Sequence, residues 1–129
     1  MNTLLNLKQP DLIGLINAGL SFKEFEALRQ KLTISAERLA EAARINSRTL
    51  YRRKKEGRFT AEESDRLYRL MDLYDRSMEA FESEIGAHDW LTRPGKLFGG
   101  RTPLEYADTE IGYQELLVIL EGIKYDSFG

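Results

Sequence analysis

The sequence predicts an all-α fold of seven or eight helices, because helical periodicity, capping motifs and stop signals follow one another along the chain. Apolar residues recur at spacings of three and four, Ser or Thr opens several of these runs with Glu three positions on, and Gly or Pro follows most of them. With 129 residues, of which 42% are hydrophobic, the chain is long enough for one or two small domains with a modest core.

Two helices are expected near the start of the chain. The segment PDLIGLINAG is typical of a short apolar helix that ends at Gly19. The segment SFKEFEALRQKL begins with a capping box, in which Ser21 stands three residues before Glu24. The apolar residues of this second helix lie on one face: Phe22, Phe25, Leu28 and Leu32.

A helix-turn-helix unit is predicted between residues 35 and 57. Its first helix is SAERLAEAA, a break follows at RIN, and its second helix is SRTLYRRKKEG, with Ser47 as the N-cap and Gly57 as the stop signal. Arg44 stands where such turns often hold glycine, which predicts a wider corner. The expected inward residues are Ala40 between the helices, Ile45 in the corner and Leu50 on the second helix.

The net charge of −2 conceals a concentration of positive charge beside this unit. Seven basic residues face one acid in residues 44–58, a local balance of +6, whereas ten acids face four bases in residues 79–129. The short basic segment is suited to a polyanion, and the acidic C-terminal third would repel one.

DNA is therefore the expected partner of the second helix. Arg48 and Arg52 project from its outward surface, where an arginine can bridge the O6 and N7 acceptors of guanine, and the later basic residues suit phosphates. The alternative interpretation of the same charges is a solvated helix end. The full set expected at DNA is Ser47, Arg48, Thr49, Tyr51, Arg52, Arg53, Lys54, Lys55 and Arg58.

A two-fold homodimer is also expected, because helix-turn-helix dimers read two half-sites about one helical turn apart. Residues 1–78 would form the N-terminal region for dimerisation and DNA binding, and residues 79–129 a compact C-terminal domain. The dimer surface is expected within residues 10–32, whose apolar side chains exceed what one small domain readily covers: Leu12, Ile13, Leu15, Ile16, Leu20, Phe22 and Phe25.

A long helix is expected to join the two regions. Thr60 would cap it with Glu63 three residues on, and the helix would run for about 25 residues to Gly86. Its apolar stripe has a period of 3.6 residues and consists of Leu67, Leu70, Met71, Tyr74, Met78 and Phe81.

The stretch WLTRPGKLFGGRTPLEYADTEIG, residues 90–112, requires an unusual chain path. Trp90 and Leu91 would anchor the end of a short helix that Pro94 and Gly95 then stop. Two further pairs of residues are expected to shape the loop: Leu97 and Phe98 pin it, and Gly99 and Gly100 supply a tight reversal with positive φ.

Two more helices are expected to complete the chain. Thr102, Pro103 and Glu105 form a capping box with proline at the first helical position. The last helix is expected over residues 110–125. Its inward residues would be Ile111, Leu116, Leu117, Ile119, Leu120 and Ile123.

Several function classes are disfavoured by composition. Without cysteine, the chain offers no disulfide, no thiolate metal site and no thiol nucleophile. His88 is the single histidine, no spacing indicates a catalytic set, and neither enzyme activity nor a cofactor is expected. No run approaches about 18 uninterrupted apolar residues and no basic leader begins the chain, so a cytoplasmic location without membrane contact is expected, with association to the bacterial nucleoid when DNA is bound.

The segments SRTLYRRKKEGRFTAEESDRLYRL and WLTRPGKLFGGRTPLEYADTEIG resemble those of the Xre/MbcA/ParS antitoxins over about residues 20–129. The family pattern combines Trp-Leu, Pro, Leu, Gly-Gly, Thr-Pro-Leu-Glu and Thr-Glu-x-Gly. The residues that match it are Trp90, Leu91, Pro94, Leu97, Gly99, Gly100, Thr102, Pro103, Leu104, Glu105, Thr109, Glu110 and Gly112.

The resemblance implies an antitoxin of a toxin–antitoxin system. Its partner would be a RES-domain toxin that consumes NAD, its C-terminal region would block the toxin's active site, and its dimer would bind its own promoter. A plain helix-turn-helix transcription regulator, with a C-terminal domain that dimerises or senses a ligand, is the alternative.

The chain departs from the family pattern at its end, where LEGIKYDSFG replaces a Gly-Arg-Ile tail with a later Gly. Gly122 stands near the expected Arg and Asp126 near the expected Gly, so aromatic and acidic tail residues are expected to replace a blocking arginine. The full set expected at the toxin is Trp90, Leu97, Phe98, Arg101, Ile123, Lys124, Tyr125, Asp126 and Phe128.

Overall fold

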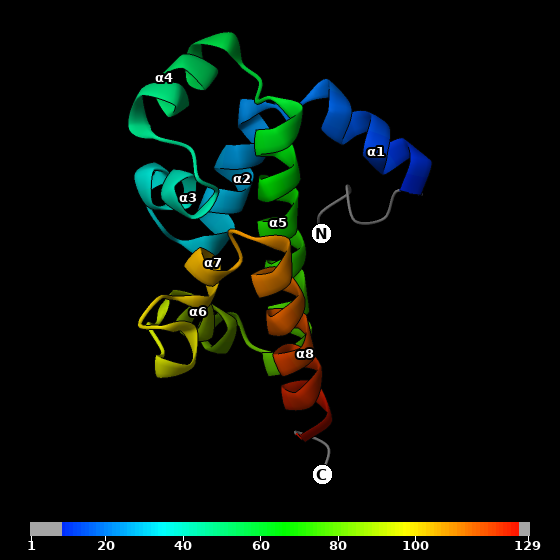
Figure 1. Ribbon diagram of the computed structural model, residues 1–129, viewed down its shortest axis with the longest axis vertical. Helices are drawn as coiled ribbons and strands as arrows, with labels where there is room; N and C mark the ends of the chain where they lie inside the picture. Colours follow the sequence, from blue (N-terminus) through cyan, green and yellow to red (C-terminus); the bar gives the residue numbers. More distant parts are fainter. Residues whose placement is uncertain (1–8, 127–129) are drawn as a thin grey trace. The chain divides into compact units, whose positions relative to one another are not determined.

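The computed structural model describes residues 9–126, and within this range the fold is all-α (Figure 1). These residues contain eight α-helices, one short 3-10 helix and no β-strand, which confirms the predicted fold class. In chain order the elements are α1 (Gln9–Ala18), α2 (Phe22–Leu32), α3 (Ala36–Ala42), α4 (Ser47–Glu56), α5 (Ala61–Phe81), α6 (Glu84–Thr92), η2 (Lys96–Phe98), α7 (Pro103–Tyr106) and α8 (Glu110–Asp126).

The chain divides into two compact units, Met1–Met71 and Asp72–Gly129, and the division falls inside α5. Each unit buries its own set of large apolar side chains. Among residues 9–126, no helix combines the length and the apolar character needed to cross a membrane.

The core of the first unit contains a cluster of three phenylalanine rings. Phe25 is fully buried, and its ring centroid lies 5.2 Å from that of Phe22 and 5.3 Å from that of Phe59. Such aromatic pairs add about 0.5–1.5 kcal/mol each beyond the area that they bury. Phe59 follows α4 in the chain, so this cluster fixes the end of the helix-turn-helix segment onto α2.

The core of the first unit buries some of the residues that were expected to form the dimer surface. Leu12, Leu20 and Phe25 are buried within their own chain, so they are not available to a second copy. Ile13 and Leu15 on α1 stay 55% and 41% exposed. The apolar excess of this region is therefore smaller than the sequence suggested, and it is concentrated on α1.

The segment that connects α1 to α2 forms backbone hydrogen bonds with the segment that connects α4 to α5. Ser21 and Arg58 form an isolated antiparallel bridge, and the Phe59 N–H donates to the Leu20 carbonyl at 2.9 Å. Gly19 permits this approach: its φ is +93°, and a Cβ atom there would stand 2.1 Å from the Phe59 carbonyl oxygen. Glycine is required at this position for both reasons.

The start of α5 agrees with the prediction. The Glu63 N–H donates to Thr60 Oγ1 at 3.2 Å and the Thr60 N–H donates to Glu63 Oε1 at 2.9 Å, so the capping box is confirmed. The predicted stripe faces inward along most of the helix. Leu67, Leu70, Met71 and Tyr74 are buried, and Met78 and Phe81 are half-buried.

The end of α5 differs from the prediction, because the helix stops at Phe81 and not at Gly86. Glu82 adopts a left-handed φ of +53°, which ends the helix. Ser83 then caps α6 by accepting the Gly86 N–H at 3.1 Å. The apolar periodicity continues across this break, which is why it suggested one longer helix.

The core of the second unit is built by one leucine from each of three helices: Leu91 on α6, Leu104 on α7 and Leu116 on α8 are almost completely buried. At the start of α8 the prediction was wrong, because Ile111 is 75% exposed. Tyr113 takes the inward position instead, and its hydroxyl donates to the Asp72 carboxylate on α5.

The loop between α6 and α7 reverses through two glycines, as predicted. Gly99 and Gly100 have φ values of +65° and +84°. Of the two residues expected to pin the loop, Phe98 is buried, whereas Leu97 is 73% exposed and does not pin it. Neighbouring residues of a short 3-10 helix point in different directions, so only one of the pair reaches the core.

Two capping motifs set the starts of α7 and α8. Thr102 and Glu105 form the predicted capping box, with N–H to oxygen distances of 2.9 and 3.2 Å. Thr109 Oγ1 accepts the Gly112 N–H at 3.1 Å, and a Cβ atom at Gly112 would stand 2.1 Å from the Tyr106 carbonyl oxygen. The Thr-x-x-Gly spacing therefore combines a helix cap with a close approach of α8 to the end of α7.

Candidate functional site

The turn between α3 and α4 has the short geometry of a helix-turn-helix corner. Arg44 adopts a left-handed φ of +60°, and the Ile45 N–H donates to the Ala40 carbonyl at 2.8 Å. The prediction of a wider corner was wrong, because arginine here takes the conformation that glycine usually supplies. Asn46, and not Ser47, is the N-cap of α4: its side chain accepts the Thr49 N–H at 2.8 Å.

The inward residues of this unit are those that the sequence predicted. Ala40, Ile45 and Leu50 are 1%, 4% and 7% exposed. Leu50 is the buried residue of α4, and Gly57 ends the helix with a φ of +83°. The buried side of α4 is therefore fixed, and most of its other residues are exposed.

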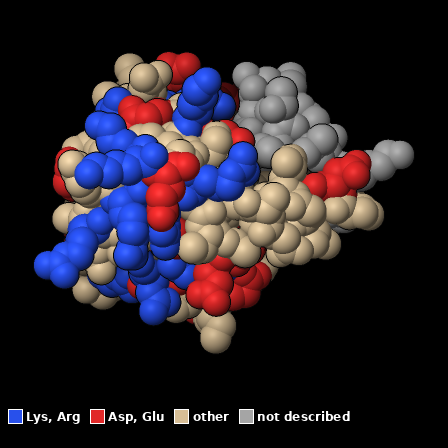
Figure 2. Space-filling view, turned by 90° about the horizontal axis from the view of Figure 1, so that it is seen from above, with Lys and Arg blue, Asp and Glu red and all other residues tan. Residues whose placement is uncertain are grey.

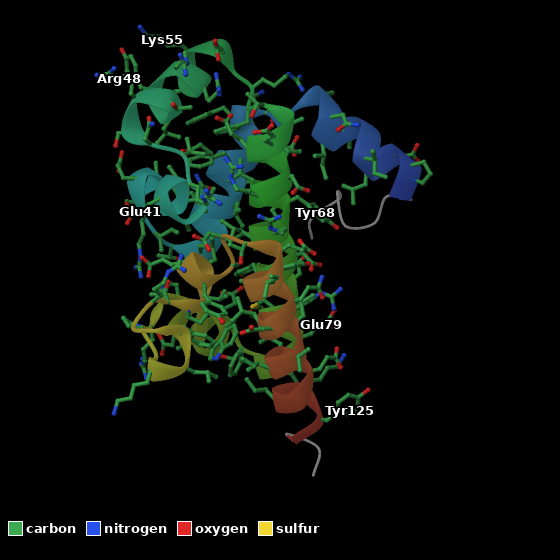
Figure 3. All side chains as sticks on the ribbon, in the orientation of Figure 1. Glu41, Arg48, Lys55, Tyr68, Glu79 and Tyr125 are labelled. Atoms are coloured by element: carbon green, nitrogen blue, oxygen red, sulfur yellow. The ribbon has the colours of Figure 1, made fainter. Side chains whose placement is uncertain are left out.

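The outward face of α4 carries most of the residues expected at DNA. Arg48, Arg52, Lys54 and Lys55 are exposed, and Figure 3 shows Arg48 and Lys55 pointing away from the ribbon. Tyr51 is 62% exposed, and Lys55 Nζ lies 4.7 Å from its ring centroid. In Figure 2, Lys and Arg side chains gather on one side of the face shown. Ser47 is exposed as well, and Thr49 is half-buried.

Arg53 differs from these residues because its guanidinium is held by the protein. Its Nε lies 2.7 Å from Glu63 Oε1 and its Nη1 lies 2.9 Å from Glu56 Oε1, and its side chain is only 14% exposed. Arg53 was expected at a phosphate, and in the structure it forms a pair that ties α4 to the start of α5. The prediction missed Glu63 as a partner, since it interpreted that residue as a helix cap alone.

The ion pair between Arg53 and Glu63 also shifts the pKa of both side chains. The hydrogen bond to Glu63 raises the pKa of Arg53. Burial by itself would raise the pKa of Glu63, but the hydrogen bonds from Arg53 and from the Thr60 N–H outweigh it and hold that pKa below its ordinary value. Both groups are therefore charged at neutral pH.

Arg58 is exposed, but its guanidinium is also engaged by the protein. Its Nη1 donates to the Gly19 carbonyl at 2.5 Å, within the joint that pairs the two segments. The remaining basic surface of α4 thus consists of Arg48, Arg52, Lys54 and Lys55, which we call the basic face.

The residues expected at the toxin are spread over the second unit. Trp90 is half-buried, with its ring centroid 5.9 Å from Phe81 and 6.4 Å from Phe98, so it packs as part of an aromatic core. These rings line an open hollow of about 370 Å³. Arg101 is engaged within the unit, because its Nη2 lies 2.9 Å from Asp108 Oδ2. Leu97, at 73% exposure, is therefore the exposed apolar member of this loop set.

The tail residues occupy the last turns of α8. Ile123 is half-buried, and Lys124 Nζ lies 3.5 Å from Glu79 Oε2 on α5. Tyr125 is 71% exposed, and Figure 3 shows it pointing away from α8. Asp126 ends α8, and Phe128 lies outside the described residues. The structure thus leaves Tyr125 accessible while Ile123 and Lys124 face their own unit.

Metal binding finds no support in residues 9–126, where no three His, Cys, Asp or Glu side chains gather as ligands.

Comparison with known proteins matches both units. Residues 11–72 match the model of the antitoxin Xre-like helix-turn-helix domain, and residues 77–125 match that of the antitoxin Xre/MbcA/ParS C-terminal toxin-binding domain. The chain is 30% identical over 119 residues to an antitoxin Xre of Yersinia enterocolitica, covering 91% of this chain and 80% of that protein. The chain belongs to the Xre antitoxin family.

A second relative extends the same likeness. An antitoxin Xre of Photorhabdus laumondii is 28% identical over 118 residues, which cover 90% of this chain and 80% of that protein. The order of domains in this Xre-family chain, DNA-binding first and toxin-binding second, follows the two compact units. The basic face lies in the helix-turn-helix domain, and α8 lies in the toxin-binding domain.

Proposed function

We propose that this protein is an antitoxin that inhibits a cognate RES-domain, NAD-consuming toxin by occluding its active site, and that it represses its own promoter as a dimer. The observation that carries the proposal is the presence of both family domains on one chain. Its role is that of a binding protein and not of an enzyme. We assign DNA binding and dimerisation to residues 1–78 and toxin binding to residues 79–129.

DNA binding is assigned to the basic face of α4. Arg48 and Arg52 would contact base edges in the major groove, and Lys54 and Lys55 would contact phosphates. Arg53 and Arg58 are left out of this set, because the protein itself engages both guanidinium groups. Tyr51 would lie beside the DNA together with Lys55, which it contacts.

The surface that binds a second copy of the chain in the dimer is assigned to α1. Ile13 and Leu15 are large, apolar and exposed on this short helix, and a dimer would cover them. A two-fold axis would also place two copies of α4 at successive major grooves of an operator.

Toxin inhibition is assigned to the second unit because of its charge. Residues 79–129 contain ten acids and four bases, so they suit a basic active site such as one that binds a phosphate-bearing cofactor. Charge complementarity of this kind speeds association with the correct partner.

The test is co-expression of the toxin encoded next to this chain, with growth and cellular NAD as readouts and operator binding measured in parallel. Full-length protein should restore growth and NAD, and it should shift a DNA fragment from its own promoter. If toxin and protein do not bind each other, while the promoter fragment is still bound, the protein is a plain transcription regulator. If the neighbouring frame encodes no RES domain, the toxin class is wrong.

A further inference from the structure

Helix α8 exposes three large apolar side chains on the side that does not pack into the second unit. Ile111, Val118 and Tyr125 are 75%, 71% and 71% exposed. The opposite side of the helix is also apolar, with Tyr113, Leu116 and Leu120 buried. A surface helix usually carries polar residues opposite its buried side, so the apolar outer side of α8 requires an explanation.

The three residues form a continuous seam. They follow one another at intervals of seven, which at about 100° per residue places them within about 40° of one another on the helix surface. Their separation of 14 residues corresponds to about 21 Å along the helix. We call these residues, together with Gly122, the α8 ridge.

Gly122 belongs to the ridge because it leaves the backbone bare beside Val118. Within the described residues, a Cβ atom at Gly122 would meet no atom within 4 Å, so nothing in the second unit demands glycine there. Glycine inside a helix lowers its stability. A bare backbone at an exposed apolar seam permits a partner to approach the helix closely.

The rims of the ridge are acidic. Glu115 and Glu121 are exposed and lie about 60° to either side of Val118 on the helix surface. Lys124 is the single basic residue in residues 110–125, and it pairs with Glu79 on α5. Glu115 is also held in place, because it accepts the Tyr106 hydroxyl at 2.5 Å.

The acidic rims indicate whether the α8 ridge binds a second copy of the chain or a different partner. In a symmetric pair of ridges, parallel or antiparallel, the rims would bring glutamate against glutamate, which is unfavourable. A partner with an apolar groove and basic rims would complement both the seam and the charges. The matched toxin-binding domain spans residues 77–125, and so contains the whole ridge.

From these observations we infer that the α8 ridge is the surface that docks in an apolar, basic-rimmed groove of the toxin. The inference rests on the proposed function and makes it more specific: Val118 is the centre of the contact, and Gly122 lets the groove close over the helix backbone. Central, desolvated apolar anchors dominate most protein interfaces.

The test compares Val118→Lys with Ile85→Lys in binding to the purified toxin encoded next to this chain. Ile85 is a matched control, since it is 76% exposed and lies on α6 in the same unit. Val118→Lys should raise the dissociation constant at least about tenfold, because it buries a charge at the centre of the interface, and Ile85→Lys should leave it within about twofold. Binding to promoter DNA and the thermal midpoint of both variants should match those of the wild type.

Gly122→Leu provides a second and independent readout. Leucine should raise the thermal midpoint of the protein and at the same time weaken toxin binding, a combination that loss of structure does not produce. Equal toxin binding by wild type, Val118→Lys and Gly122→Leu would overturn the inference, as would equal weakening by Val118→Lys and Ile85→Lys. A wild-type protein that fails to bind the toxin would instead refute the proposed function. If Val118→Lys abolishes self-association without changing toxin binding, the ridge binds a second copy and the inference is wrong.

Discussion

The two units of this protein present opposite kinds of recognition surface on the same kind of secondary structure. In the first unit, α4 buries Leu50 and exposes a row of cations, so its outer side suits a polyanion. In the second unit, α8 buries one apolar side and exposes a second one between glutamates. The comparison shows that the exposed residues of a helix, and not its helical fold, determine which partner the helix binds.

The same comparison separates cations that support the structure from cations that are available to a ligand. Arg53 and Arg58 belong to the basic run of the sequence, but one is paired with Glu63 and the other with the Gly19 carbonyl. Arg48 and Lys55 stay exposed on α4. Of the six basic residues expected at DNA, two are therefore engaged by the protein itself.

The largest effect is expected from Gly112→Val in the second unit. The new Cβ would stand 2.1 Å from the Tyr106 carbonyl oxygen, so α8 has to move away from α7. We expect a loss of about 4 kcal/mol in the free energy of unfolding, measured by urea denaturation. Gly122→Ala on the same helix is the control, and a similar loss in both variants would contradict the assigned role of Gly112.

The next largest effect is expected from Glu63→Gln, which leaves the Arg53 guanidinium without its closest carboxylate. The loss should be about 3 kcal/mol at neutral pH. Because the folded-state pKa of Glu63 is lowered, the stabilisation is present at neutral pH and is lost as the pH falls through that pKa, so the difference from wild type should shrink in acid. Urea denaturation at several pH values measures both effects.

Glu56→Gln is the matched control for this prediction, because Glu56 also pairs with Arg53 but its side chain is 52% exposed. Its effect should stay below about 1 kcal/mol. A constant difference between Glu63→Gln and wild type across the pH range would show that the charge of Glu63 is not what stabilises the joint.

On the basic face, Arg48→Ala or Arg52→Ala should each cost about 1–3 kcal/mol in binding to the operator and relax the sequence preference. Lys55→Ala should instead weaken binding to all sequences and flatten the salt dependence. Electrophoretic mobility shifts with operator and scrambled DNA distinguish the two behaviours. If all three variants behaved equally, the basic face would contact phosphates only and would not read the bases.

The smallest effect is expected from Gly122→Ala, with a gain of about 0.5–1 kcal/mol in stability, since the site is helical and has room for a methyl group. Thermal denaturation measures it. A loss of stability would mean that the backbone at Gly122 is constrained by something other than the helix.

Much of the fold could be predicted from the sequence because the signals are local. The capping boxes of Thr60 with Glu63 and of Thr102 with Glu105 span three residues each, and both form as expected. The inward positions of α3 and α4 follow from helical spacing. The left-handed turn at Glu82 could not be predicted, since apolar periodicity continues on both sides of it.

The candidate sites were harder to predict because they depend on distant partners. Arg58 meets a carbonyl 39 residues away, and Arg53 meets a carboxylate 10 residues away. Nothing in the local sequence marks either contact. The ridge was also missed, since Ile111 was assigned to the core from its spacing alone, although Tyr113 holds that place.

The central claim is that one chain carries a charge-dependent surface on α4 and an apolar surface on α8. The most direct measurement is the salt dependence of both affinities on the wild-type protein, between about 50 and 200 mM salt. Operator affinity should fall by at least about a thousandfold if a dimer contacts six or more phosphates, whereas toxin affinity should change by less than about tenfold. A toxin affinity that falls as steeply as the operator affinity would contradict the account.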